Sequence, residues 1–190
     1  MGIHEPKTRR WTRAEYYQMA DLGWFQGQRV QLIEGEIVEM SPMGNPHAAA
    51  IRLGSRALDP AFGPNFDVRP QLPLDLSPIS VPEPDFAVVA GHPRDYLEKA
   101  PTTATLVVEV ADSSLEYDRN EKASLYAKAG LTEYWIVNLV DRVVEVLTVP
   151  RRDPTAVFGH SYARREVKSP GETIRPPEAE RDVAVADLLP

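Results

Sequence analysis

Leu106-Val107-Val108-Glu109-Val110-Ala111 is the strongest strand signal in the chain, and its one polar residue is a carboxylate. Successive side chains of a strand point to opposite faces, so Glu109 shares its face with Val107 and Ala111. Burying a lone charge costs several kcal/mol or forces the group to neutralise. Glu109 therefore lies either on an edge strand, in water or in a salt bridge, or inside the protein beside a dedicated partner.

A second carboxylate, Asp85, leads into the apolar run Phe86-Ala87-Val88-Val89. Aspartate is common at such junctions between loop and strand as a turn residue. The prolines of Pro82-Glu83-Pro84 would stiffen the entry and hold a side chain still, as a metal ligand requires. Three interpretations are possible: Asp85 is a structural turn residue, Asp85 is a metal ligand, or Glu83 is the metal ligand in its place.

Lys122 follows at the start of an expected helix, where its neighbours at helical spacing are Leu125, Tyr126 and Ala129. A lysine on an apolar stripe either extends its ammonium to solvent or directs it at a buried group. An ammonium beside a metal-bound phosphate can orient a water and stabilise developing negative charge. Two carboxylates at strand ends with a nearby lysine therefore suggest a divalent metal site.

The composition indicates one domain and restricts the metal. The chain has 190 residues, of which 43% are hydrophobic, enough for one sizeable core, and we expect a single domain over residues 1–190. It contains no cysteine, which excludes disulfides and thiolate ligands. Oxygen or imidazole ligands remain, and they favour Mg²⁺ or Mn²⁺ over zinc.

The charge and hydropathy patterns bear on location and partners. No apolar run approaches the roughly 20 residues of a membrane span, and the first six residues lack the pattern of a secretory signal, so we expect a cytoplasmic protein. The formal net charge of −7 gives no general attraction for polyanions. This charge counts against a simple DNA-binding module, but less against a nuclease that uses metal ions.

Strands and helices are mixed along the chain. Thr12 and Glu15 form a capping-box pattern, Pro60 should end the second helix, and Asp118 with Glu121 resembles a second capping box. The expected helices span residues 12–22, 47–58 and 118–130. The expected strands span residues 30–40 (a strand or tight hairpin), 66–76, 84–90, 105–111, 134–139, 143–149 and 162–167. This order predicts a mixed sheet flanked by helices, with a β-rich fold as the alternative.

Other conspicuous residues carry weaker signals. His47 begins a helix after a proline turn and is either a cap, a surface residue or a base. The three tryptophans are most simply core or interface residues, and the arginine pairs at 151–152 and 164–165 form a solvated face or a phosphate-contacting patch. No glycine-rich phosphate loop is present, which argues against nucleotide-dependent chemistry.

An ordered series of short motifs resembles the Uma-type family of restriction-endonuclease-like proteins, which is placed in the PD-(D/E)XK nuclease superfamily. The series covers roughly residues 11–149. It consists of Leu32-Ile33-Glu34-Gly35-Glu36-Ile37-Val38-Glu39-Met40-Ser41-Pro42, His47, Pro84-Asp85, Val107-Val108-Glu109-Val110, Tyr117-Asp118-Arg119 with Lys122, Tyr126-Ala127-Lys128-Ala129-Gly130 and Glu133-Tyr134-Trp135-Ile136-Val137.

The resemblance implies a restriction-endonuclease-like α/β fold, of mixed α+β type, in which Asp85 and Glu109 bind the metal. The usual superfamily lysine lies two residues after the glutamate, where this chain has Ala111; the family takes its lysine from the next helix, which matches Lys122. An additional acidic residue from the N-terminal part would be Glu34 or Glu36. Two departures are Gln31-Leu32-Ile33 and Asp112-Ser113-Ser114, where relatives have Glu-Leu-Ile and Ser-Pro.

These observations give the functional expectations. The first is an Mg²⁺- or Mn²⁺-dependent endonuclease acting on DNA, with catalytic Asp85, Glu109 and Lys122 and with Glu34, Glu36 and His47 as possible additions. The alternatives are a catalytically inactive scaffold or interaction protein with the same fold, and a hydrolase of smaller phosphoesters. We expect a nuclease-like core at about residues 11–149, a C-terminal β-rich extension at 150–190, and a homodimer.

Overall fold

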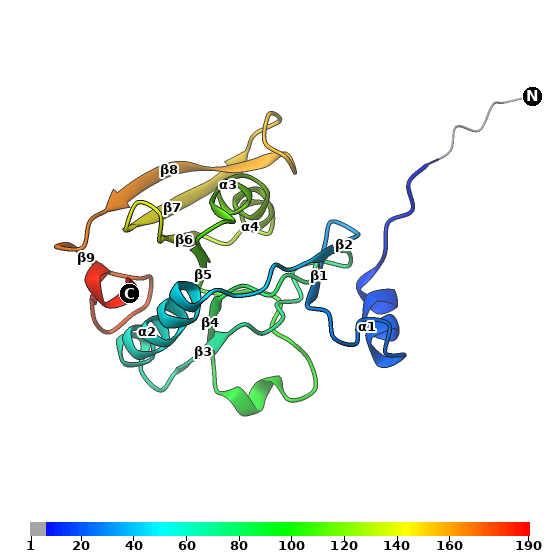
Figure 1. Ribbon diagram of the computed structural model, residues 1–190, viewed down its shortest axis with the longest axis horizontal. Helices are drawn as coiled ribbons and strands as arrows, with labels where there is room; N and C mark the ends of the chain where they lie inside the picture. The colour runs from blue at the N-terminus through cyan, green and yellow to red at the C-terminus, as the bar shows by residue number, and fades with distance from the viewer. Residues whose placement is uncertain (1–6) are drawn as a thin grey trace, which may run out of the picture.

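The computed structural model describes residues 7–190 (Figure 1). The N-terminal hexapeptide, to which the expectation about a secretory signal refers, lies outside the described residues. The helices are α1 (Arg13–Asp21), α2 (Asn45–Phe62), α3 (Leu115–Tyr117) and α4 (Ala123–Lys128), with a π-helical turn at Asp118–Lys122 and short 3-10 turns at Pro93–Tyr96 and Val185–Leu188. The strands are β1 (Val30–Ile33), β2 (Glu36–Glu39), β3 (Phe66–Pro70), β4 (Phe86–Ala90), β5 (Leu106–Ala111), β6 (Glu133–Asn138), β7 (Val143–Arg152), β8 (His160–Lys168), β9 (Thr173–Ile174) and β10 (Val183–Ala184).

Six of the strands form one mixed sheet in the order β3-β4-β5-β6-β7-β8. All neighbouring pairs are antiparallel except β5 and β6, which are parallel and are connected through α3 and α4. The expected mixed sheet with flanking helices is therefore confirmed. Glu109 lies on β5, a central strand with paired neighbours on both sides, which excludes the edge-strand reading of this residue.

Helices cover the two faces of the sheet. Helix α2 and the C-terminal segment pack on one face, where Val108 and Val110 point, and α4 packs on the other, where Val107 and Ala111 point (Figure 1). The alternation expected for this strand is thus observed. Glu109 lies between these two largely apolar layers and is only 5% exposed.

A smaller unit lies beside the sheet. Helix α1 packs on the β1–β2 hairpin through a small hydrophobic cluster, which includes Tyr16 and Leu32. The hairpin turn has positive φ at Glu34 and Gly35, as two-residue hairpin turns require. A bridge between Leu32 and Val81 joins the hairpin to the segment that enters β4. This unit therefore approaches the sheet next to Asp85.

Two boundary predictions are wrong. Helix α2 does not end at Pro60 but continues to Phe62. Proline so near the helix end removes only one donor of the last turn, and the helix stops at Gly63, whose φ of 70° ends the α conformation. The strand expected over residues 66–76 ends at Pro70, because Gln71 adopts a positive φ of 52°.

The expected cap at Asp118 is also wrong. Asp118 has helical backbone angles, and the helical segment begins earlier, at Leu115. Its carboxylate is buried and accepts a hydrogen bond from Ser114 Oγ at 2.6 Å instead of capping the helix that follows. The sequence pattern of a capping box is present, but burial of the side chain decides its role.

The C-terminal residues complete both the sheet and the cover of its first face. Strand β8 pairs with β7 along the edge of the main sheet, and the segment from β9 to Leu188 contributes Ile174, Val185 and Leu188 to the cluster around α2. Within residues 7–190, no helix has the length and apolar character that crossing a membrane would need.

Close packing of α2 on β4 gives a stability prediction. A Cβ atom at Gly54 would lie 2.6 Å from Cζ of Phe86, whose ring is fully buried and cannot move aside. We expect Gly54→Ala to lower the free energy of unfolding by about 1–3 kcal/mol through overpacking, despite the better helix propensity of alanine. Urea denaturation measures this change.

The matched control is Ser55→Ala on the same helix, whose hydroxyl only bonds back to the Ile51 carbonyl. Its unfolding midpoint should stay close to that of the wild type. Equal midpoints for both variants would contradict the packing argument.

Candidate functional site

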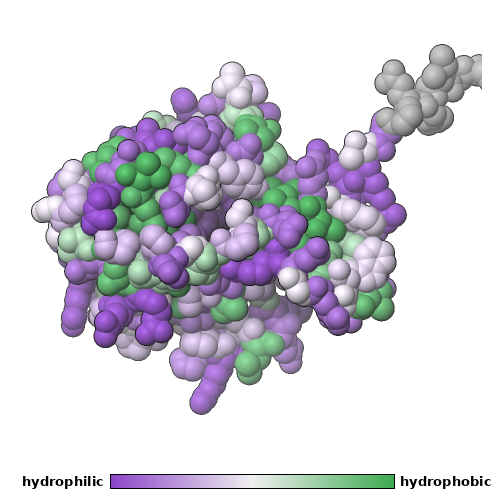
Figure 2. All heavy atoms as spheres, in the orientation of Figure 1, coloured by the Kyte–Doolittle hydropathy of each residue, from purple (hydrophilic) through white to green (hydrophobic). Residues whose placement is uncertain are grey.

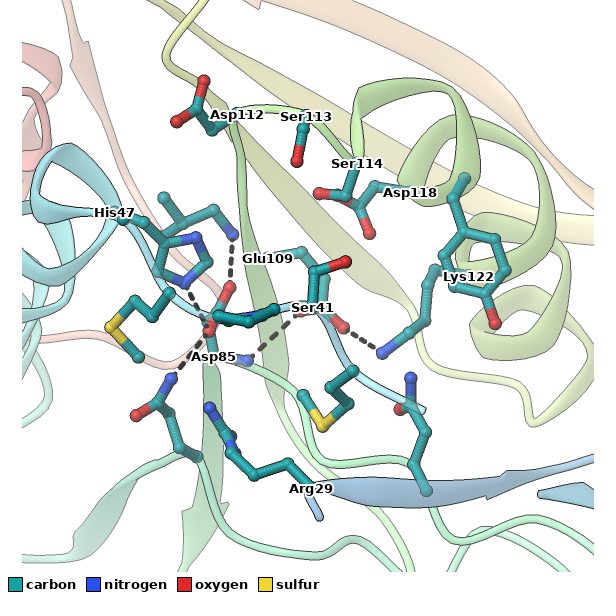
Figure 3. Close-up of a pocket in the computed structure, with 18 of the residues that line it drawn as sticks. Arg29, Ser41, His47, Asp85, Glu109, Asp112, Ser113, Ser114, Asp118 and Lys122 are labelled. Carbon is teal, nitrogen blue, oxygen red and sulfur yellow. Dashed lines mark hydrogen bonds and ion pairs between the residues drawn. The ribbon is translucent and has the colours of Figure 1, made fainter. Parts of the chain in front are cut away.

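The register of β4 and β5 brings Asp85 and Glu109 together across 24 residues of sequence. Phe86 pairs with Val108, so Asp85 lies directly beside the Glu109–Val110 segment. The backbone N–H of Asp85 donates to Glu109 Oε2 at 3.2 Å, and the N–H of Val110 donates to Asp85 Oδ2 at 2.8 Å. Figure 3 shows the two carboxylates at the centre of the pocket. The backbone itself therefore fixes both side chains.

Lys122 completes this pair from the helical segment above the sheet. Its Nζ donates to Glu109 Oε1 at 2.7 Å, and the hydroxyl of Tyr126 donates to the same oxygen at 2.6 Å. Lys122 is 3% exposed, so the reading in which its ammonium extends to solvent is excluded. The lysine is directed at the buried carboxylate.

The π turn at Asp118–Lys122 sets the direction of these side chains. A π turn contains more residues than an α turn, and it therefore rotates the residues before it relative to those after it. Asp118, Lys122 and Tyr126 are spaced four residues apart, and all three are buried. Such turns are frequent at functional sites.

His47 approaches Asp85 from the opposite side. It lies in the first turn of α2, where Pro46 is tolerated because the first turn has free N–H groups anyway. His47 Nε2 lies 3.0 Å from Asp85 Oδ1, and Gln71 Nε2 donates to the same oxygen at 3.3 Å. Burial lowers the pKa of His47, but the hydrogen bond to Asp85 and nearby carboxylates outweigh it and raise the pKa overall.

Burial and mutual proximity both shift the pKa values of Glu109 and Lys122. Burial raises the pKa of Glu109, and the Lys122 ammonium opposes this rise. Burial likewise works against the charged form of Lys122, but the charge and hydrogen bond of Glu109 keep the pKa of that ammonium above its ordinary value. Lys122 is therefore a cation in the folded protein at neutral pH.

These groups line an open cavity of about 490 Å³. Arg29, Gln31 and residues 38–44 of the hairpin unit form one wall, and Asp112, Ser113 and Ser114 form part of the opposite wall. Figure 2 shows a largely polar face with a hollow near its centre. The carboxylates are therefore buried by neighbouring side chains but face a space that a ligand can enter.

Comparison with known proteins identifies the family. A family model described as "Putative restriction endonuclease" (Uma2) matches residues 13–187. The chain belongs to the Uma2 family. The resemblance noted in the sequence is thereby confirmed. No curated protein matches the chain.

A solved structure supports the fold of this Uma2 chain. It is the crystal structure of a protein from Anabaena variabilis described as "a putative nuclease belonging to DUF820". The two chains superpose with a TM-score of 0.59 at 18% sequence identity, over 84% of this chain and 88% of the other. The restriction-endonuclease-like core expected from the sequence is therefore confirmed as the fold of this Uma2 protein.

The structure brings four of the six candidate residues of this Uma2 chain together: Asp85, Glu109, Lys122 and His47. Glu34 and Glu36 lie elsewhere. The Glu34 carboxylate bonds to Lys128 and Ser80, and Glu36 is exposed with Arg10 as its nearest cation, at 3.8 Å. The hairpin turn directs both glutamates away from the cavity.

Glu83 and Asp118 are two further acidic residues near the site, and only Asp118 lines the cavity. Glu83, the alternative ligand, lies outside the cavity lining, and its nearest cation is Arg29 at 3.8 Å. Asp118, which sequence reasoning assigned to a cap, lines the cavity instead. Its spacing of four residues from Lys122 and eight from Tyr126 is the sequence signal that could have revealed it.

The donor set of the site is suited to a hard divalent ion. Asp85 Oδ2 and Glu109 Oε2 each accept one backbone N–H, which leaves a lone pair on each oxygen. Over residues 7–190, no three His, Asp or Glu side chains are grouped so that they could hold an ion alone. Mg²⁺ commonly takes only one or two carboxylates and fills its remaining positions with water and substrate oxygens. Asp85 and Glu109 therefore fit such an ion.

Asp118 gives a pH-dependent prediction. Burial, and then the charge of Glu109, raise its pKa from 3.8 to about 7. The folded state thus binds this proton more tightly than the unfolded state, so its contribution to stability is present at low pH and falls as pH rises from about 4 to 7. We expect Asp118→Asn to match the wild type near pH 4 and to be more stable at pH 8, by up to roughly 4 kcal/mol.

Thermal unfolding with a metal chelator present, between pH 4 and 8, measures the difference. Parallel melting-temperature curves for the two proteins would show that Asp118 does not carry this proton.

Proposed function

We propose that this protein is a cytoplasmic, metal-dependent endonuclease that hydrolyses DNA phosphodiester bonds at the cavity between the hairpin unit and the sheet. Asp85 and Glu109 are the metal ligands and Lys122 is the catalytic cation. The observation that carries the proposal is the buried contact of 2.7 Å between Lys122 Nζ and Glu109 Oε1, beside a second carboxylate that faces an open cavity. Membership of a family described as restriction endonucleases supports it.

Mg²⁺ or Mn²⁺ held by the two carboxylates would lower the pKa of a water and neutralise charge on the scissile phosphate. Contacts within the protein already hold the two carboxylates in place. The two backbone N–H groups fix the carboxylates without using all their lone pairs. Tyr126 holds Glu109 through the other oxygen, so the side chain needs no rearrangement on binding.

Lys122 acts through its position and its permanent charge. Glu109 uses one donor of the ammonium, and Tyr126 lies 3.4 Å from the same nitrogen. A lysine ammonium has three donors. A remaining donor can orient the attacking water or bind a non-bridging phosphate oxygen, where negative charge builds up in the transition state. Because the site is buried, this charge is worth more than it would be in water.

The protein has more acidic than basic residues, which bears on how it would bind DNA. With a net charge of −7, the protein does not attract DNA as a whole. The cavity wall itself carries Arg29, and exposed arginines lie on α2 at residues 52 and 56. Local cations together with the metal therefore have to supply the phosphate contacts, and cleavage should weaken steeply with added salt.

An inactive nuclease-fold scaffold is the second candidate, and one observation favours it. All four oxygens of Asp85 and Glu109 already have hydrogen-bond donors from the protein, with Gln71 as the donor to Asp85 Oδ1. A site that is satisfied in this way can persist as a structural network without any metal. Metal binding and cleavage separate the two candidates.

Metal binding tests the ligand assignment. Millimolar Mn²⁺ should raise the melting temperature of the wild type, because an ion that binds only the folded state stabilises it. The isosteric double variant Asp85→Asn, Glu109→Gln should show no such rise. Asp75→Asn is the matched control, since Asp75 is a largely buried carboxylate that bonds to Tyr17 and Arg13 outside the cavity lining. A wild type that does not respond to Mn²⁺ would favour the scaffold.

Cleavage tests the role of Lys122. Lys122→Met keeps the apolar stem and removes the charge, so Mn²⁺ should still stabilise the variant while DNA cleavage falls by about 100-fold or more. Nicking of supercoiled plasmid at fixed salt measures the rate. Cleavage at the wild-type rate by the folded variant would remove Lys122 from the mechanism.

We further propose that the protein is a homodimer. Strand β8 is the sheet edge that follows β7, and its outer side has no partner strand within residues 7–190. Most of its side chains between Ala163 and Val167 are exposed. Light scattering at the concentration used for cleavage should give twice the chain mass of 21.2 kDa, whereas the mass of one chain would refute the dimer.

A further inference from the structure

A second buried carboxylate lies in the same row of the sheet as Glu109. Glu109 of β5 pairs with Ile136 of β6, and Ile136 pairs with Glu145 of β7. Paired residues share a face of a sheet, so the two glutamates point to the side covered by α4. Neighbouring strands are 4.7–4.9 Å apart, which places the two backbones roughly 10 Å from each other.

Glu145 is fully buried and has three partners. Arg119 Nε donates to both of its oxygens, at 3.1 and 3.2 Å, and Arg119 Nη2 donates to Oε1. Arg165 Nε donates to Oε2 at 2.7 Å, and Asn138 Nδ2 donates to Oε1 at 3.1 Å. Burial alone would raise the pKa of Glu145, but these hydrogen bonds lower it to about 2. The group is therefore a fixed anion at neutral pH.

The π turn connects the two carboxylates. Arg119 and Lys122 both belong to it, three residues apart, and each binds one glutamate of the row. The hydroxyl of Tyr134, on β6, donates to the Asp118 carbonyl at 3.1 Å. The turn is thus attached to three consecutive strands of the sheet. Two of these attachments, to β6 through the Asp118 carbonyl and to β7 through Arg119, do not involve Lys122 itself.

Stability alone does not account for a charged cluster at this place. A buried ion pair is often no more stable than well-packed hydrophobic residues of similar volume. What the Arg119–Glu145 pair adds is geometry, because a guanidinium that binds both oxygens of a carboxylate allows one orientation. A contact of this kind transmits that orientation along the short π turn to Lys122.

We propose that Glu145 and Arg119 are positioning residues for Lys122: they hold the π turn so that the ammonium meets Glu109 at the edge of the cavity. The inference rests on the proposed function as far as catalysis is concerned. The contact between Lys122 and Glu109 is a property of the folded protein in either case. It can therefore be measured separately from cleavage.

The experiment compares wild type, Glu145→Gln, Arg119→Lys and the control Asp75→Asn. Glu145→Gln should lower kcat for DNA cleavage by about 10- to 100-fold, with KM and the Mn²⁺ midpoint little changed, because only the position of Lys122 is altered. Arg119→Lys should retain an intermediate kcat, because an ammonium keeps the charge but not the paired contact. Asp75→Asn should cleave like the wild type.

A second readout does not depend on activity. The Lys122 ammonium signal in a ¹⁵N NMR spectrum of metal-free protein is assigned by its absence in Lys122→Met. Its shift or loss in folded Glu145→Gln supports the inference, and an unchanged signal together with an unchanged kcat overturns it. Should the wild type not cleave DNA, the proposed function fails and the NMR signal alone decides. Should Glu145→Gln not fold, the same measurements on Arg119→Lys decide.

Discussion

The burial of one carboxylate on a central strand is the constraint on which the site depends. Glu109 points into an apolar layer, where an unpaired charge would cost several kcal/mol. The structure meets this cost with donors from separate parts of the chain: the Asp85 backbone, Lys122 and Tyr126. Each donor belongs to a different segment, and its contact with Glu109 fixes the position of that segment relative to β5. The polar contacts that satisfy Glu109 therefore also assemble the site.

The residues that could be predicted from the sequence are those whose charge conflicts with the local apolar pattern. Glu109 and Lys122 were recognisable because their neighbours at strand or helix spacing are hydrophobic, and strand β5 was predicted almost to its ends. Asp118 was wrongly assigned as a helix cap because its local pattern also matches a capping box. Only the fold shows that its side chain is buried and lines the cavity. The contact of Gln71 with Asp85 could not be predicted, because the backbone of Gln71 has a positive φ that no sequence pattern indicates.

The hairpin unit and the sheet contribute differently to the cavity. The sheet and α4 hold the charged groups through backbone contacts and buried hydrogen bonds, which fix them closely. The hairpin unit has its own hydrophobic cluster and joins the sheet near Val81, yet it provides a whole wall of the cavity. The charged groups of the site and the wall at its entrance thus belong to different segments of the chain. These segments are joined by Ile33 and Val38, which pack in the hydrophobic cluster beneath α4, and by the contact of Lys128 with Glu34.

The π turn makes the site sensitive to chain length as well as to residue type. Removing one residue between Asp118 and Lys122 would allow the segment to close into an uninterrupted α-helix, which advances about 100° per residue. Arg119 and Lys122 could then no longer both face the sheet. Substitutions in this segment keep the number of residues in the turn, whereas deletion of a single codon would change the direction of every charged side chain that follows it. The length of this segment is therefore a constraint of its own, separate from the identity of its residues.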